Sequence, residues 1–460
     1  MTLFILAILL IALLLIATEP INKMNKAAVA IFAGVTCWLL YISDGSFYII
    51  DRHPFSFLSF LSSHAITATS VKEFIARFVF FDYLVQCANI VLFLLATMSI
   101  VEVLNNNGCF DFITEWLRTR RPKKLLWVLA SLTFVLSANL DNLATVVLLL
   151  TIVHPLLQTD KLRKIYCSVI ILAANCGGAM TVIGDITSLT LWSQKLVTPT
   201  EYFYHLAIPV VAALVTILFL LHHTLPSRIE FAQTHPPYRG DDTLLTRPQR
   251  LLLLFVGIGG LWFIPTFHRI TLLPSSLGAL CVLALIWIVN ELCNRSLLGS
   301  DTMVQKRLPQ ALQYANLQNI LYFVGISLMF GALTETGLLA KLNRWILETG
   351  ADSYVIGIVM SGLSAIFGNI ATLIGGIDIF HVSERLTVPA EFACDGQFWY
   401  VLSFATTFGG SLLIGGTVSG ILLMRMEGIS ATWYIRHITP KVLAGLAVGM
   451  LLMWGTSFLF

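Results

Sequence analysis

Apolar segments long enough to cross a bilayer as helices recur from one end of this 460-residue chain to the other. Hydrophobic residues make up 57% of the sequence, charged residues 12%, and the mean hydropathy is +0.84. A soluble domain of this size carries more charge and fewer apolar runs. The sequence therefore predicts an all-α, multi-pass membrane protein.

The apolar segments fall into uninterrupted and interrupted spans. Uninterrupted helices are expected at 2–18, 27–42, 84–104, 205–223, 250–265, 274–292, 319–335 and 441–459. Two longer stretches that contain glycine pairs, 165–194 and 399–426, are expected to be broken helices. Residues 2–18 lack the flanks of a cleaved signal and are interpreted as the first span. Residues 55–81 leave room for an amphipathic or a further re-entrant helix.

Two more apolar stretches, 125–153 and 353–377, are expected to be re-entrant hairpins. Basic residues flank the first stretch on both sides, at 118–124 and at 161–164. Because basic residues favour the cytoplasmic side, a single span would put one cluster outside, whereas a hairpin keeps both inside. The hairpin tip then falls on S-A-N-L-D-N at 137–142, where irregular backbone can line a cavity.

The motifs of the first half recur in the same order in the second half. S-A-N-L-D-N at 137–142 returns as S-A-I-F-G-N at 364–369, and the glycine pair at 177–178 returns at 409–410. With five spans and one hairpin in each half, the second half is expected to insert with the opposite orientation, as an inverted repeat. The predicted units are 1–223, a cytoplasmic linker at 224–249, and 250–460.

Two aspartates, Asp141 and Asp185, lie inside these apolar segments. A charge at bilayer depth costs at least ~2.5–3.5 kcal/mol, so each is a candidate functional residue. The alternative is pairing with a buried Lys or Arg, but between 125 and 192 those residues occur only at 161–164. Carboxylates beside neutral oxygens suit a hard cation. We expect Na⁺ at Asp141 and Asp185, with further oxygens from Asn142, Asn175, Thr187, Ser364, Asn369, Ser411, Thr417 and Ser419.

Protons are expected to compete with Na⁺ for the same oxygens, because burial and a second nearby carboxylate both favour the protonated form. Two carboxylates and one Na⁺ imply more than one proton per ion and hence electrogenic exchange. Glu102, near the end of the third span, is a candidate proton relay, or alternatively an interfacial glutamate. Glu335 is expected at the external surface.

Several segments resemble one known family. They are N-K-A-A at 25–28, residues 93–102, 137–142, 175–188 and 407–420, and W-Y…P at 433–440. At these residues the chain resembles the NhaD-type sodium/proton antiporters, within the ion-transporter superfamily that also holds arsenite and carboxylate transporters. The resemblance implies a homodimeric exchanger of Na⁺, or Li⁺, for H⁺ in the bacterial inner membrane, whose transport part moves as an elevator.

The chain departs from this family where acidic residues or histidine are usual. Gly368 stands where an acid normally precedes the second-hairpin asparagine, Gln86 and Asn89 where His and Glu are usual, and Asn316 where an Asp is usual. An alternative function is a sodium-coupled anion or carboxylate symporter on the same scaffold, although Asp141 and Asp185 would repel an anion. We expect no enzymatic activity, no cofactor beyond the transported ions, and no nucleic-acid partner.

Overall fold

The computed structural model describes residues 1–62, 64–65, 67–117, 121–157, 159–226, 245–293, 317–381 and 389–457. In this part of the chain the regular elements are helices, which confirms the all-α membrane fold. The helices long and apolar enough to span a membrane are Lys26–Asp44 (α3), Ala68–Asn106, Pro199–His222 (α13), Arg247–Thr271 (α14), Ser275–Cys293 (α15), Leu317–Glu335 (α18) and Thr439–Thr456 (α25). Most of the predicted linker 224–249, residues 118–120 and Asn316 lie outside the described residues.

The long helix Ala68–Asn106 begins well before the span predicted at 84–104. It comprises α6 (Ala68–Phe74), a π-helical turn at Ile75–Phe80, and α7 (Phe81–Asn106). Thr67 and Ser70 form a capping box that starts the helix, which is a local signal for a helix N-terminus. Two short helices, α4 (Ser46–Arg52) and α5 (Pro54–Leu61), precede it and fill the segment that the sequence left open.

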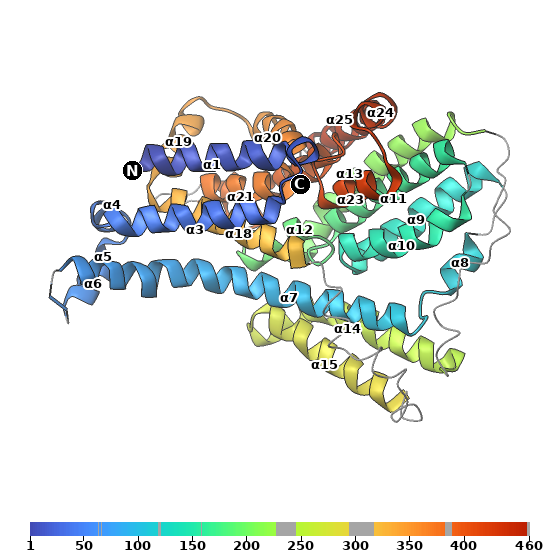
Figure 1. Cartoon of the computed structure of the whole chain (residues 1–460), viewed down its shortest axis with the longest axis horizontal. Helices are drawn as coiled ribbons and strands as arrows, with labels where there is room; N and C mark the ends of the chain where they lie inside the picture. The colour runs from blue at the N-terminus through green and yellow to red at the C-terminus, as the bar shows by residue number, and fades with distance from the viewer. Residues whose placement is uncertain are drawn as a thin grey trace.

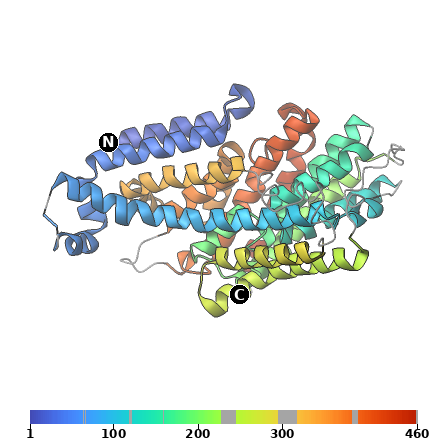
Figure 2. The same ribbon diagram turned by 60° about the horizontal axis from the view of Figure 1, so that its bottom comes forward.

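Helix α7 runs along most of the molecule and contacts elements on several sides (Figures 1 and 2). Helices α14 and α15 pack against each other and against α7, and α3 packs against α18. Elsewhere α13 packs against α25. The remaining elements outside the interrupted helices are α1 (Thr2–Ala17), α2 (Glu19–Asn22), α8 (Phe112–Trp116), α19 (Leu338–Glu348), α24 (Ala431–His437) and a 3₁₀ turn at Ala390–Phe392.

Four pairs of shorter helices meet at breaks in the backbone. Each pair flanks one of the motifs singled out in the sequence. The pairs are α9 (Pro122–Asn139) with α10 (Asn142–Leu156), α11 (Asp160–Met180) with α12 (Ile186–Ser193), α20 (Ser353–Phe367) with α21 (Asn369–Phe380), and α22 (Gln397–Gly410) with α23 (Val418–Glu427). Within each half the first pair packs against the second, since α11 contacts α9 and α10, and α22 contacts α20 and α21.

The same hydrogen bonds join the two pairs in each half. The asparagine after each hairpin break donates its backbone N–H to a glycine carbonyl in the neighbouring break, and the motif serine donates to a carbonyl of the neighbouring helix. The bonds are Asn142 to Gly184 (3.2 Å) and Asn369 to Gly416 (3.2 Å), then Ser137 to Ala174 (2.8 Å) and Ser364 to Thr406 (2.6 Å). The local packing of the two halves is thus equivalent, while their opposite orientation in the membrane stays a prediction.

Glycine permits a close helix crossing between α3 and α18. A Cβ atom on Gly325 would lie 2.5 Å from the backbone of Ala30 and Ile31. We therefore expect Gly325→Ala to lower the free energy of unfolding by about 1–3 kcal/mol, because backbone atoms must move apart. Thermal unfolding of the purified protein in detergent measures the change. Gly259→Ala, at a helical glycine with no atom within 4 Å of its added Cβ, is the control and should not destabilise the protein.

Candidate functional site

Asp141 and Asp185 both stand at the N-termini of helices that begin inside the protein. Asp141 caps α10, and its Oδ2 accepts hydrogen bonds from the backbone N–H groups of Leu143 (3.0 Å) and Ala144 (3.3 Å). Asp185 caps α12, and its Oδ1 accepts from the N–H of Ile186 at 2.8 Å. Side-chain oxygens at this position satisfy N–H groups that have no partner within the helix, and a carboxylate also suits the positive end of the helix dipole. The breaks thereby hold two negative groups at fixed positions.

The two carboxylates are buried and have no basic partner. Asp141 is 5% exposed and Asp185 is 8% exposed. Among the described residues, no Lys, Arg or His nitrogen lies within 4 Å of either carboxylate. The alternative interpretation of the sequence is that each aspartate pairs with a buried Lys or Arg. No such pair is found in the described part of the chain. The two buried carboxylates instead repel each other when both are ionised.

Neutral oxygens surround the two carboxylates. The amide of Asn142 donates to Asn175 Oδ1 at 3.0 Å, and Asn142 also interacts with Asp185. Thr187 donates its hydroxyl to Asp185 Oδ2 at 2.7 Å. All three side chains are buried. The structure brings together the ion-binding residues predicted in the first half, Asp141, Asn142, Asn175, Asp185 and Thr187.

One hydrogen bond connects this group to the second half of the chain. Asn175 Nδ2 donates to Ser411 Oγ, in the break between α22 and α23, at 2.8 Å. The Cβ atom of Asn369 and the methyl carbon of Thr417 both lie beside Gly410, just before the same break. Ser419 is buried in the first turn of α23. Ser364 uses its hydroxyl to bond the carbonyl of Thr406, which is a packing contact like that of Ser137 in the first half.

This arrangement can hold a small hard cation. A carboxylate has about four lone-pair sites on its two oxygens, so the hydrogen bonds described above leave room for a metal ion, and amide and hydroxyl oxygens are adjacent. Repulsion between two buried carboxylates falls when either a cation or a proton binds. The geometry thus allows a proton and a cation to replace each other at one place.

Three further positions singled out in the sequence, Gln86, Asn89 and Glu102, lie along α7. Glu102 is half-buried in α7, a helix that contacts α10 and α12, and its role as a proton relay stays a prediction. Asn89, which replaces a usual family acid, donates its amide to Ser193 Oγ at 2.9 Å. Ser193 is the last residue of α12, so Asn89 contacts the helix that Asp185 begins.

Three buried glutamates were not assigned to a site from the sequence, and each stands at a helix end. The expectation of Glu335 at the external surface is wrong, since it is 3% exposed and accepts hydrogen bonds from Tyr83 (2.9 Å) and His53 (2.8 Å). Glu427 binds Arg163 and His154, and Glu19 binds Arg425. The sequence shows that these acids stand at the ends of apolar helices. It does not predict their partners, which are more than 250 residues away.

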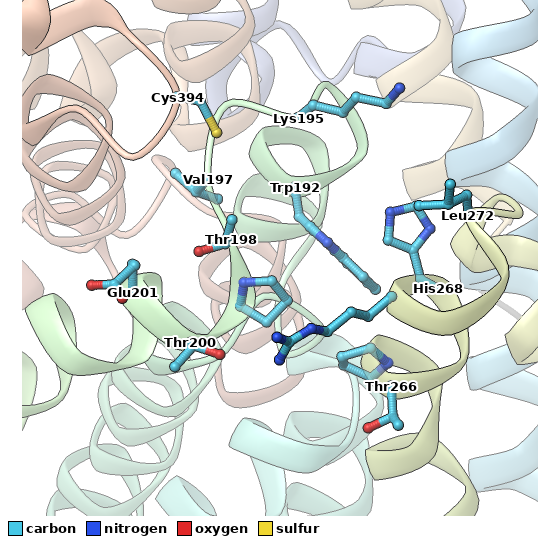
Figure 3. Close-up of a pocket in the computed structure, with 13 residues that line it drawn as sticks. Trp192, Lys195, Val197, Thr198, Thr200, Glu201, Thr266, His268, Leu272 and Cys394 are labelled. Atoms are coloured by element: carbon cyan, nitrogen blue, oxygen red, sulfur yellow. The ribbon is translucent and has the colours of Figure 1, made fainter.

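A wider pocket of about 610 Å³ lies elsewhere, between the α12–α13 connection and α14 (Figure 3). Trp192, His268 and Leu272 line one part of it, and Glu201 and Thr200 another. Neither Asp141 nor Asp185 is among its lining residues, and its charged side chains are Lys195, Arg269 and Glu201. This excess of basic groups does not suit a cation, so the helix breaks remain the candidate cation site.

The bond between Asn175 and Ser411 can be tested by a double-mutant cycle. We expect Asn175→Ala and Ser411→Ala each to destabilise the protein, and the double variant to lose about 0.6 kcal/mol less than the two single losses together, as is typical of side-chain hydrogen bonds between membrane helices. Thermal unfolding in detergent measures the four proteins. Strict additivity would show that the two halves are not coupled through this bond.

Comparison with known proteins agrees with this architecture. The family model described as citrate transporter, CitMHS, matches residues 4–374. The chain is 28% identical to sodium/proton antiporter 2 of Arabidopsis thaliana over 96% of both chains. It is 30% identical to sodium/proton antiporter 1 of the same plant over 79% of this chain, although the match spans only 61% of that protein. It is 27% identical to the Na⁺/H⁺ antiporter NhaD of Vibrio cholerae over 80% of this chain and 78% of that protein.

A solved structure shares the fold. The Alcanivorax borkumensis YdaH transporter superposes with a TM-score of 0.53 over 84% of this chain and 89% of that one, at 12% identity. The family model covers far more than half of the chain, and the named relatives extend over most of it. The chain therefore belongs to the citrate transporter family of membrane proteins and is a member of its NhaD type.

Proposed function

We propose that this protein exchanges Na⁺, or Li⁺, for H⁺ across a membrane. The observation that carries the proposal is the pair of buried carboxylates, Asp141 and Asp185, held on two helix N-termini without a basic partner in the described structure. Relatives named sodium/proton antiporters support it. A cation and a proton bind in turn at these two carboxylates, and the carrier crosses the membrane loaded with either one.

Alternating access is proposed to be of the elevator type. The hairpins and broken helices pack against each other within each half and meet through Asn175 and Ser411. That contact favours their movement as one body relative to the long helices α3, α7, α14, α15 and α18. The NhaD-type relatives from bacteria support an inner-membrane location and the family resemblance favours a homodimer, and both remain proposals.

Transport in proteoliposomes tests the exchange. We expect Na⁺ to dissipate an imposed pH gradient, and Asp141→Asn and Asp185→Asn each to slow it roughly tenfold or more, since a contact to a charged group is worth about 1.5–3 kcal/mol. Asp82→Asn, at an exposed aspartate near the start of α7, is the matched control and should retain the wild-type rate. Full activity of both site variants would exclude these carboxylates as the exchange site.

The ratio of ions exchanged follows from the number of carboxylates. One Na⁺ that displaces protons from both Asp141 and Asp185 moves net charge, so exchange should be electrogenic. The membrane voltage at which flux reverses, measured at several Na⁺ and H⁺ gradients, gives the ratio. If the ion gradients at which flux reverses do not depend on the membrane voltage, exchange is one-for-one and a single carboxylate titrates.

Sodium-driven uptake of a carboxylate such as citrate is the second candidate function. The description of the matching family model favours it, whereas the negative charge of Asp141 and Asp185 disfavours an anion beside them. Uptake of radiolabelled citrate into the same proteoliposomes, with an inward Na⁺ gradient, separates the two. Citrate uptake without cation-induced proton movement would replace the exchange proposal.

A further inference from the structure

The two hairpins differ in how their second helix is capped. Position 368 in the second hairpin is equivalent to Asp141 in the first, because both precede the asparagine that bonds the neighbouring glycine carbonyl. In the first hairpin the Asp141 carboxylate accepts from the second and third residues of α10. In the second hairpin residue 368 is glycine, and α21 begins with no side-chain cap. The equivalent N–H groups, of Ile370 and Ala371, therefore lack the carboxylate that their counterparts have.

A small pocket lies where that carboxylate is missing. Gly368, Asn369, Gly416, Lys26 and Tyr322 are among its lining residues. A Cβ atom on Gly368 would lie 3.4 Å from Gly416 O and 3.8 Å from the Tyr322 hydroxyl. The pocket volume of about 10 Å³ is enough for a single water-sized ligand. The helices that begin here, α21 and α23, have 12 and 10 residues.

Lys26 brings a positive charge to this pocket. It is 6% exposed, and its ammonium lies 4.7 Å from the centre of the Tyr322 ring. In the described structure its ammonium has no hydrogen bond and no ion pair within 4 Å. Glu19 acts on it electrostatically, but the Glu19 carboxylate is bound by Arg425 at 2.9 Å. Glu19, Arg425 and Lys26 together therefore carry one unbalanced positive charge.

Two side chains that line the pocket, Lys26 and Tyr322, carry hydrogen-bond donors. The Lys26 ammonium offers three N–H groups, and the Tyr322 hydroxyl has no hydrogen bond among the described residues. A buried charge without hydrogen-bond partners is strongly unfavourable. Helix N-termini with unsatisfied N–H groups attract anions, and the nearby ammonium strengthens that attraction. The arrangement is the reverse of the first half, where two carboxylates occupy the corresponding helix ends.

We propose that this pocket binds one small monovalent anion of the size of chloride. The anion accepts hydrogen bonds from the Lys26 ammonium, the Tyr322 hydroxyl and the uncapped first turn of α21. It neutralises Lys26 and supplies the second hairpin with the negative charge that Asp141 supplies to the first. The proposal concerns binding alone and does not depend on which ion the protein transports.

Direct binding of chloride to the purified full chain tests the site. The protein in chloride-free gluconate buffer is titrated with radiolabelled chloride, and we expect saturable binding of one ion per chain. Lys26→Met should weaken binding at least tenfold, since it removes the charge and its donors. Lys161→Met, at an exposed lysine of α11, is the matched control and should bind as wild type. The absence of saturable binding to the wild type, or equal binding by Lys26→Met, would overturn the proposal.

Tyr322→Phe keeps the experiment decisive if Lys26→Met does not fold. This variant retains the ring that packs beneath the ammonium and removes the hydroxyl, so affinity should fall roughly fivefold, as expected for one lost hydrogen bond. The rise in thermal unfolding temperature when chloride replaces gluconate reports the same binding and should shrink in the variant. An unchanged rise would show that chloride binds elsewhere, or that water alone fills the pocket.

Discussion

Interrupting a helix inside a membrane is costly because the backbone groups at the break lose their partners and find no water in the hydrocarbon. In the first half of this protein the cost is offset locally at both breaks. The carboxylates of Asp141 and Asp185 accept from the N–H groups that begin α10 and α12, and the Asn142 N–H bonds the carbonyl of Gly184 in the adjacent break. The groups that make the irregular backbone stable are therefore the same groups that carry the site's charge.

The second half has equivalent backbone hydrogen bonds at its breaks but different side chains there. The Asn369 N–H bonds the carbonyl of Gly416, as in the first half, and Thr417 caps α23 with a hydroxyl where Asp185 uses a carboxylate. Gly368, with a φ of +94°, occupies the place of Asp141 in a backbone conformation that favours glycine. The described helix breaks of the first half thus carry two carboxylates, whereas those of the second half carry none. That asymmetry favours the first half as the place for the proposed cation site.

The sequence predicted the breaks but not the partners across the fold. Small and amide-bearing residues beside Asp141 and Asp185 in apolar surroundings indicated both helix interruptions, because few other structures suit such residues at that depth. The fold class followed from the length and hydropathy of the spans. In contrast, nothing local predicts that His53 meets Glu335, because that contact depends on how α18 packs against the distant N-terminal helices. The third span also begins earlier than predicted, because the capping box at Thr67 starts the helix well before the apolar run.

Glycine determines how tightly hairpin and broken helix pack in each half. Gly177 lies directly against the carbonyl of Phe134, and Gly409 lies in the same way against the carbonyl of Ser361, so neither position has room for a side chain. Backbones that pack this closely cannot slide past each other without losing the contact. If these pairs move as one body, as proposed, the contacts that must break are those to the N-terminal helices. The ion pair between Glu19 and Arg425 on α23 is one of them, and its separation would leave a buried carboxylate without its guanidinium.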